Sequence, residues 1–187
     1  AIASQLCTVL EYLHSRQPPI IYRDLKPSNI MRDPMGKLYL IDFGIARRYT
    51  PGQRRDTQAL GSPGYAAPEQ YGHSQTTPQA DIYSLGALLH QFLSGQDPSD
   101  HPQGLLPLHP NGQAGNADLE VLVTQMLLPN PGERPDSMRM VAEALDRIQQ
   151  MVASTSKHIW QPPTPQAYPE SGGPQIQFHL LPQASVK

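Results

Sequence analysis

The chain has 187 residues and a formal net charge of −2, with 14 Lys and Arg against 16 Asp and Glu. That balance argues against a nucleic-acid binder, which usually carries a basic stripe, and no apolar run approaches the roughly 18 residues that span a bilayer. The single cysteine, Cys7, excludes an intrachain disulfide and favours a reducing, cytoplasmic location. Because Cys7 lies in an apolar helical stretch, we expect an inert core thiol rather than a reactive one.

The first third of the chain combines one helix with short strands. Helical spacing of apolar residues predicts an amphipathic helix over residues 1–15, which Gln17-Pro18-Pro19 ends. This helix has no start signal, so we expect the chain to be cut from a longer one. Short β-prone pieces follow at residues 20–22 and 37–42, with a turn at residues 33–36 between them.

The remainder alternates long loops with helices. Residues 44–80 are rich in Gly, Pro, Gln and Thr, and so long a loop in a compact domain is normally functional or disordered. A mostly apolar helix is predicted over residues 80–95, with Gly95 as its stop signal. A second loop precedes a helical stripe at residues 119–127, and Asp136 or Ser137 can cap a last helix. From about residue 152 the Pro/Gln/Ser/Gly composition predicts a linker or tail.

The stretch IYRDLKPSNIM, residues 21–31, crowds Asp24, Lys26 and Asn29 between apolar flanks, and DFG follows at Asp42. Buried charge is costly unless it is paired or used. Asn29 and Asp42 are hard oxygen ligands, Asp24 is a carboxylate placed as a base, and Lys26 is a mobile cation. Proteins bind Mg²⁺ through one or two carboxylates plus substrate phosphates, and phosphoryl transfer needs mainly positioning and charge neutralisation. The pattern therefore indicates phosphoryl-transfer chemistry.

These motifs resemble the catalytic loop, metal-binding motif and activation-segment end of protein kinases. The likeness rests on YRDLKPSN at 22–29, DFG at 42–44 and AAPE at 66–69, and it continues through DIYSLG at 81–86 and NPGERP at 130–135. It covers about residues 1–150; DLKPSN is the serine/threonine form, and GSPGYAAPEQY at 61–71 is most similar to bacterial kinases. The implied fold is mainly α: a kinase-like C-terminal lobe, a helical bundle with short β-hairpins at the catalytic and metal-binding loops, and a disordered tail over 151–187.

The resemblance also implies roles for individual residues. Asp24 would accept or orient the proton of the substrate hydroxyl, and Lys26 would steady the transferring phosphoryl group of ATP. Asn29 and Asp42 would bind Mg²⁺, and Met31 would form an apolar floor under the adenine ring. The Ser62 hydroxyl would contact Asp24 and Lys26. Asp81 would hold the backbone of the catalytic loop, and Glu69 and Arg134 would form a structural ion pair.

Each of these residues has a plainer reading when it is taken alone. Asp24 or Asp42 could be a turn carboxylate, Met31 could be a core residue, and Ser62 could simply begin the turn at Ser62-Pro63-Gly64. The joint occurrence of the motifs is what favours the functional reading. Tyr22 stands where most kinases have histidine, but this residue packs rather than transferring protons.

The larger departure from the family pattern is the small lobe. No Gly-rich phosphate loop, strand lysine or helix glutamate precedes the helix at residues 1–15, so we expect the ATP-covering lobe to be missing and this chain alone to be inactive. Two rival functions remain, a pseudokinase or interaction module and a kinase of small molecules. Loss of Asp24, Asn29 or Asp42 would mark the first, and loss of the segment that ends in APE would mark the second; all are present.

Arg23 precedes the expected base and needs an anion, since an unpaired guanidinium beside an apolar strand is costly. Kinases with arginine at this position commonly dock a phosphothreonine on it, and Thr57 is the best candidate among Thr50, Thr57 and Ser62. The alternative is an unmodified Thr57, with Arg23 paired to a nearby carboxylate. The resemblance further implies protein substrates and ATP as partners, and it allows a dimer for autophosphorylation in trans.

Overall fold

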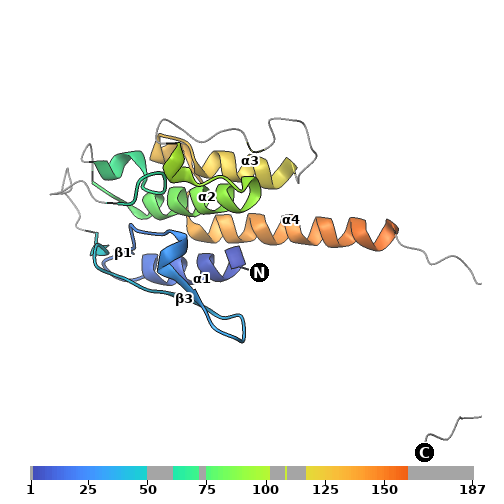
Figure 1. Ribbon diagram of the computed structural model, residues 1–187, viewed down its shortest axis with the longest axis horizontal. Coiled ribbons are helices and arrows are strands. Elements are labelled where there is room, and N and C mark those ends of the chain that lie inside the picture. Colours follow the sequence, from blue (N-terminus) through green and yellow to red (C-terminus); the bar gives the residue numbers. More distant parts are fainter. Residues whose placement is uncertain (1, 50–60, 72–74, 102–107, 109–116, 160–187) are drawn as a thin grey trace, which may run out of the picture.

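The computed structural model describes residues 2–49, 61–71, 75–101, 108 and 117–159. Over these ranges the chain is mainly helical, as expected, with two small antiparallel sheets beside the helices (Figure 1). Helix α1 (Ile2–His14) packs against α4 (Met138–Ile159), and α2 (Pro78–Ser94) packs against α3 (Ala117–Met126). Contacts between α1 and α2 and between α3 and α4 join these pairs into one bundle.

Helix α1 presents one apolar face to the bundle. Leu6, Cys7, Leu10 and Leu13 are its buried residues, at the i, i+3/i+4 spacing of a helix face. Burial, reinforced by the nearby negative charge of Asp146, raises the pKa of the Cys7 thiol to about 12. A thiol that stays protonated is a poor nucleophile, which agrees with an inert role in the core.

Helix α2 lies at the centre of the bundle. It is buried on almost every side between Ala80 and His90, as its mostly apolar sequence predicted. The helix begins at Pro78, two residues before the expected start, because the Thr77 hydroxyl accepts a hydrogen bond from Gln79 N and Pro78 suits the first turn. Gly95 ends it in the left-handed conformation, with φ of 72°, and donates its N–H to Gln91 O at 2.8 Å.

The strands differ from the expected arrangement. Strand β2 (Ile30–Arg32), which we did not predict, pairs with β3 (Leu38–Leu40) across the turn at residues 33–36. Strand β1 (Ile20–Ile21) pairs instead with the distant β4 (Arg47–Arg48). This β1–β4 pairing is not a hairpin, and in the sequence residues 22–29 lie between a strand of one sheet and a strand of the other.

The short 3-10 helices and α4 complete the described part. Each 3-10 helix begins with proline, whose fixed φ suits a first helical turn; they are η1 (Pro27–Asn29), η2 (Pro68–Tyr71), η3 (Pro98–Asp100) and η4 (Pro131–Glu133). The Ser137 hydroxyl accepts a hydrogen bond from Met140 N at 3.3 Å and so caps α4. This helix continues to Ile159, beyond the expected start of the tail. None of the helices in the described ranges combines the length and apolar character that crossing a bilayer requires.

Candidate active site

The loop after β1 brings a carboxylate, an ammonium group and an amide together. Asn29 closes η1, and its Nδ2 donates to Asp24 O at 2.9 Å and to Asp24 Oδ2 at 2.8 Å. Lys26 Nζ lies 3.1 Å from the same Oδ2. The single turn of η1 therefore folds the DxKxxN spacing into one polar group.

A hydroxyl from a different segment completes this group. Ser62 Oγ donates to Asp24 Oδ1 at 2.7 Å and accepts from Lys26 Nζ at 2.7 Å. The turn that carries Ser62 is pressed against η3: Gly64 has φ of 79°, and a Cβ there would lie 2.2 Å from the carbonyl carbon of Pro98. Only glycine fits this approach. Asp24, Lys26, Asn29 and Ser62 are called the Asp24 cluster below.

A buried aspartate on α2 supports the backbone of the loop. Asp81 is fully buried, and its carboxylate accepts from Tyr22 N at 2.9 Å and from Arg23 N at 2.8 Å. His14 Nε2, at the end of α1, lies 2.7 Å from Asp81 Oδ2. These bonds help to hold Arg23 at φ of 72°, a left-handed conformation that is uncommon for a non-glycine residue.

Gln70 provides a second support, which the sequence analysis missed. Its side chain is fully buried; Nε2 donates to Arg23 O at 2.9 Å and Oε1 accepts from Ala67 N at 3.1 Å. The amide thus joins the AAPE segment to the residue before Asp24. A glutamine in a loop has no periodic signal, and its position directly after the APE sequence was the available clue. His14 was missed for a similar reason, since it reads as an ordinary residue at a helix end.

Tyr22 contacts the DFG segment. Its hydroxyl donates to Ile41 O, and its ring lies edge-on to Phe43 with centroids 5.1 Å apart. Burial, together with the negative charges of Asp24 and Asp42, raises the pKa of Tyr22 to about 12. The phenol therefore stays neutral at physiological pH and links the catalytic-loop segment to the DFG segment.

The register of the β2–β3 pair brings the residue before Asp42 opposite Asn29. Ile41 N donates to Asn29 O at 3.0 Å, so Asp42 follows directly on a residue that is bonded to Asn29. The Asp42 side chain is exposed, its φ is 59°, and its Oδ1 accepts from Gly44 N at 3.0 Å. An amide and one exposed carboxylate fit a Mg²⁺ ion that takes its remaining ligands from phosphates and water. Met31, on β2, exposes 56% of its surface.

Glu69 and Arg134 form a buried ion pair, in which Arg134 Nη1 and Nη2 donate to the two carboxylate oxygens at 2.7 Å and 2.9 Å. Arg134 also donates to three backbone carbonyls, those of Gln79, Leu128 and Pro129. The pair therefore joins the end of the AAPE segment to the loop between α3 and α4. Such bidentate geometry with every donor used is what a buried charge pair requires.

The expected anion contact of Arg23 falls partly outside the described residues. Arg23 is buried, with 4% of its surface exposed. Thr50 and Thr57 lie outside the described ranges, so a phosphothreonine on Arg23 stays a prediction.

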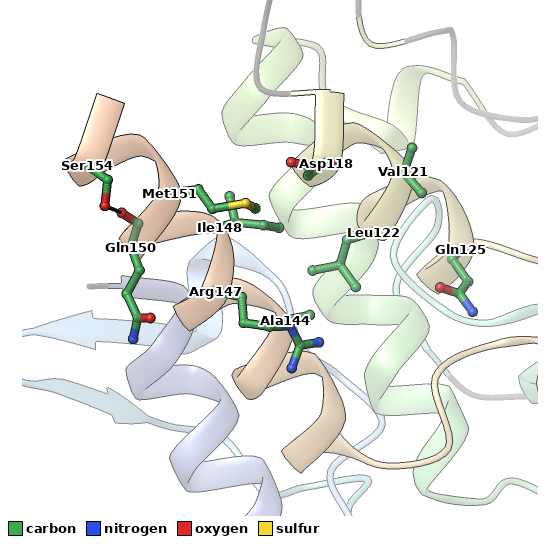
Figure 2. A pocket seen from close by; sticks show the side chains of 10 residues that line it. All are labelled: Asp118, Val121, Leu122, Gln125, Ala144, Arg147, Ile148, Gln150, Met151 and Ser154. Carbon is green, nitrogen blue, oxygen red and sulfur yellow. Dashed lines mark hydrogen bonds between the residues drawn. The ribbon is translucent and has the colours of Figure 1, made fainter. Parts of the chain in front are cut away.

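A groove between α3 and α4 lies apart from these residues. Its volume is about 850 Å³, and Leu122 of α3 faces Ile148 and Met151 of α4 across it (Figure 2). Asp118 and Arg147 are its charged lining residues. None of the predicted site residues contributes to it.

Comparison with protein-family models matches residues 1–154 to the protein kinase domain. Similar curated proteins include Serine/threonine-protein kinase A of Synechocystis sp., which is 33% identical in an alignment of 180 positions that covers 79% of this chain and 33% of the relative. Serine/threonine-protein kinase F of the same organism is 32% identical over 78% of this chain and 30% of the relative. Serine/threonine-protein kinase D1044.8 of Caenorhabditis elegans is 31% identical over 83% of this chain and 17% of the relative. The chain thus spans about a third or less of the length of these relatives.

Proposed function

Because the chain belongs to the protein kinase family, we propose that it is the large, C-terminal lobe of a serine/threonine protein kinase. The proposed reaction transfers the γ-phosphate of ATP to a serine or threonine hydroxyl of a protein. The observation that carries the proposal is the Asp24 cluster, in which one carboxylate meets an ammonium group, an amide and a hydroxyl from another segment. The proposed lobe covers about residues 1–150, and α4 carries its last turns into the proposed linker or tail.

The contacts of Asp24 suit a positioned base. A carboxylate has about four lone-pair sites, and Asn29, Lys26 and Ser62 engage three of them. The remaining site can accept the proton of a substrate hydroxyl. The Ser62 hydroxyl already lies at 2.7 Å from Oδ1, a distance suited to proton transfer in such a contact. Asn29 meanwhile fixes the plane of the carboxylate.

Lys26 is placed to act on the phosphoryl group. Its ammonium has three donors, and two of them point to Asp24 Oδ2 and Ser62 Oγ. The third donor is left for an oxygen of the transferring phosphoryl group, whose charge a compact cation stabilises. Ser62 keeps the ammonium and the base in contact through one hydroxyl, which supports a role for it beyond starting a turn.

Asn29 and Asp42 are the proposed Mg²⁺ ligands, and Met31 is the proposed apolar contact for adenine. Mg²⁺ bound with ATP would neutralise phosphate charge during transfer. Asp42 is exposed, which leaves its carboxylate accessible to a metal–nucleotide complex, and it directly follows Ile41, whose N–H donates to Asn29 O. The exposed Met31 lies two residues after Asn29, on β2. Residues that cover ATP from the other side are proposed to belong to a small lobe in a longer protein, so residues 1–187 alone are expected to be inactive.

The cellular context is part of the same proposal. We propose protein substrates, which the family supports, a cytoplasmic location, which the single buried thiol supports, and autophosphorylation in trans. The usual sign of the alternative, a pseudokinase, is loss of Asp24, Asn29 or Asp42, and all three are present.

Substitution of Asp24 in a protein that carries this lobe together with a small lobe tests the proposal. Asp24→Asn keeps the shape of the side chain but removes the base, and it should lower the rate of phosphate transfer roughly 10²- to 10⁴-fold. Binding of Mg·ADP, measured by calorimetry, should stay within about twofold. The matched control is Asp33→Asn, because Asp33 is a carboxylate in the β2–β3 turn. Equal transfer rates for wild type and Asp24→Asn would overturn the proposal.

A further inference from the structure

A polar pocket lies where the end of α1 meets the β1–β4 sheet. Its volume is about 410 Å³, and its lining residues are Ser15, Arg16, Gln17, Pro18, Ile20 and Arg48. None of them belongs to the Asp24 cluster, and the sequence analysis gave none of them a role in binding or catalysis. Two of the six side chains are guanidinium groups, and none is acidic.

The backbones that carry the two arginines are held together by hydrogen bonds. Ile20 of β1 is the register partner of Arg48 of β4, and Tyr49 N donates to Pro19 O at 2.7 Å. Arg16 N donates to Leu13 O at 3.2 Å, which extends the last turn of α1. Arg16 is therefore held at the end of α1, and Arg48 is held on β4 by its pairing with β1.

Arg16 is also oriented through its side chain. Its guanidinium lies over the Tyr12 ring at 4.2 Å from the centroid, Nε donates to Tyr12 O at 3.1 Å, and Nη2 donates to Ser15 Oγ at 3.0 Å. A guanidinium has five N–H donors, so three remain after these two bonds. The bond to Tyr12 O also reduces the partial negative charge at the end of α1, which would otherwise repel an anion.

Arg48 contributes the second positive charge. Its side chain is exposed, and no hydrogen bond or ion pair joins it to the other described residues. Among the described lining residues no acidic side chain balances these two cations. Two cations in one pocket repel each other, and an anion between them would remove that repulsion.

We propose that this pocket, formed by Arg16 and Arg48, binds a phosphate dianion. Phosphate matches the fork of a guanidinium, which can engage two oxygens at once, and its double charge balances two arginines. The exposed Gln17 amide supplies a further donor at the rim. The pocket is larger than one phosphate ion needs, so a phosphate carried on a serine or threonine side chain also fits. Because β1 leads directly into Arg23 and Asp24, a ligand that bridges α1 and β4 would also stabilise the β1–β4 pairing.

Titration of the 187-residue chain, followed by NMR of backbone amides and arginine Nε–H groups, tests this inference without any nucleotide. The probes are inorganic phosphate, a short peptide with one phosphothreonine, its unphosphorylated counterpart, and sodium chloride at matched ionic strength. Saturable shifts at Arg16 and Arg48 are expected with the phosphate-bearing probes and not with the other two. Tighter binding of the phosphopeptide would identify a phosphorylated protein as the source, and tighter binding of inorganic phosphate would identify the free ion.

Variants distinguish phosphate binding in this pocket from nonspecific attraction of phosphate to positive charge. Arg16→Gln and Arg48→Gln should each weaken phosphate binding at least fivefold, whereas Arg32→Gln, an exposed arginine on β2, should leave it unchanged. The wild-type fold should persist in all three, because these side chains are exposed. Phosphate shifts that appear only at Lys26 or Arg23, or equal affinity in all three variants, would overturn the inference. Its failure would leave the proposed kinase function untouched, since Asp24 takes no part in the measurement.

Discussion

The loop around Asp24 and the helical bundle beside it are stabilised in different ways. The bundle is apolar, with Leu6, Leu10, Leu85 and Leu88 fully buried in one continuous cluster. The loop is polar, and its short sheets have only two or three residues in each strand. Such short strands are not stable in isolation, so the loop depends on bonds from side chains that the bundle holds in place.

Three buried polar side chains provide that connection. Asp81 bonds the backbone of Tyr22 and Arg23, Gln70 bonds Arg23 O, and Arg134 holds Glu69 at the end of the AAPE segment. Each lies on a helix or at a helix end with 5% or less of its surface exposed. The geometry of the site therefore depends on the bundle, which holds the loop through a few hydrogen bonds.

The largest loss of stability is expected from a substitution that breaks the buried ion pair of Glu69 and Arg134. Glu69→Ala leaves Arg134 buried without its carboxylate, and breaking a buried pair in this way costs about 3–5 kcal/mol of the free energy of unfolding. Urea unfolding followed by circular dichroism measures this loss. The matched control is Arg139→Ala, which removes an exposed partner of Glu11 with 73% of its side-chain surface accessible.

Such surface pairs contribute about 0–1 kcal/mol, so the control should change little. Equal losses in Glu69→Ala and Arg139→Ala would contradict the idea that buried polar connections, rather than polar contacts in general, support the loop.

A smaller effect is expected at Gln70, and it should be local. Gln70→Leu removes the partners that it supplies to Arg23 O and Ala67 N, at a cost of about 1–3 kcal/mol. Because Arg23 precedes Asp24, NMR shifts of Asp24 and Ser62 should change as well.

Gln79→Leu is the matched control for this experiment. Gln79 also donates to backbone carbonyls, those of Pro135 and Asp136, so its loss should destabilise the chain to a similar degree. The shifts of Asp24 and Ser62 should nevertheless stay as in the wild type. If both variants disturb Asp24 alike, Gln70 has no specific role in positioning the loop.

The smallest expected effect is on the pH dependence of stability, and it can be compared between one tyrosine of the loop and one beside the bundle. Burial raises the pKa of Tyr22 in the loop and of Tyr65 beside α2 to about 12. An unfolded chain loses these protons near pH 10, so the stabilisation is complete below about pH 10 and is lost as pH rises toward 12. Tyr22→Phe and Tyr65→Phe should each flatten the fall of the urea midpoint over this interval. An unchanged slope in either variant would show that its phenol does not titrate differently on folding.

Local patterns predicted the helices better than they predicted the site. Apolar spacing and Gly95 located α2, and the Ser137 cap located the start of α4. The pairing of β1 with β4 was missed because two-residue strands have too little periodicity to show which partner they choose. The end of α4 was placed too early because composition alone does not show where a helix loses its packing.

At the site, resemblance to known motifs indicated Asp24, Asn29 and Asp81, and the structure brings Asp24, Asn29, Lys26 and Ser62 into contact. Gln70 and His14 could not be predicted in the same way. Their partners are 47 and 67 residues away in the chain, and a hydrogen bond over such a separation leaves no local signal.

The bond between Asp81 and Tyr22 also has a consequence during synthesis of the chain. The two residues are separated by 59 positions, and ribosomes add about 5–20 residues per second, so Asp81 is made roughly 3–12 s after Tyr22. During that time the backbone N–H groups of Tyr22 and Arg23 lack the carboxylate that accepts their hydrogen bonds in the folded chain. They directly follow the apolar pair Ile20 and Ile21. A nascent chain at this stage therefore exposes a short apolar segment whose hydrogen-bonding groups are not yet satisfied.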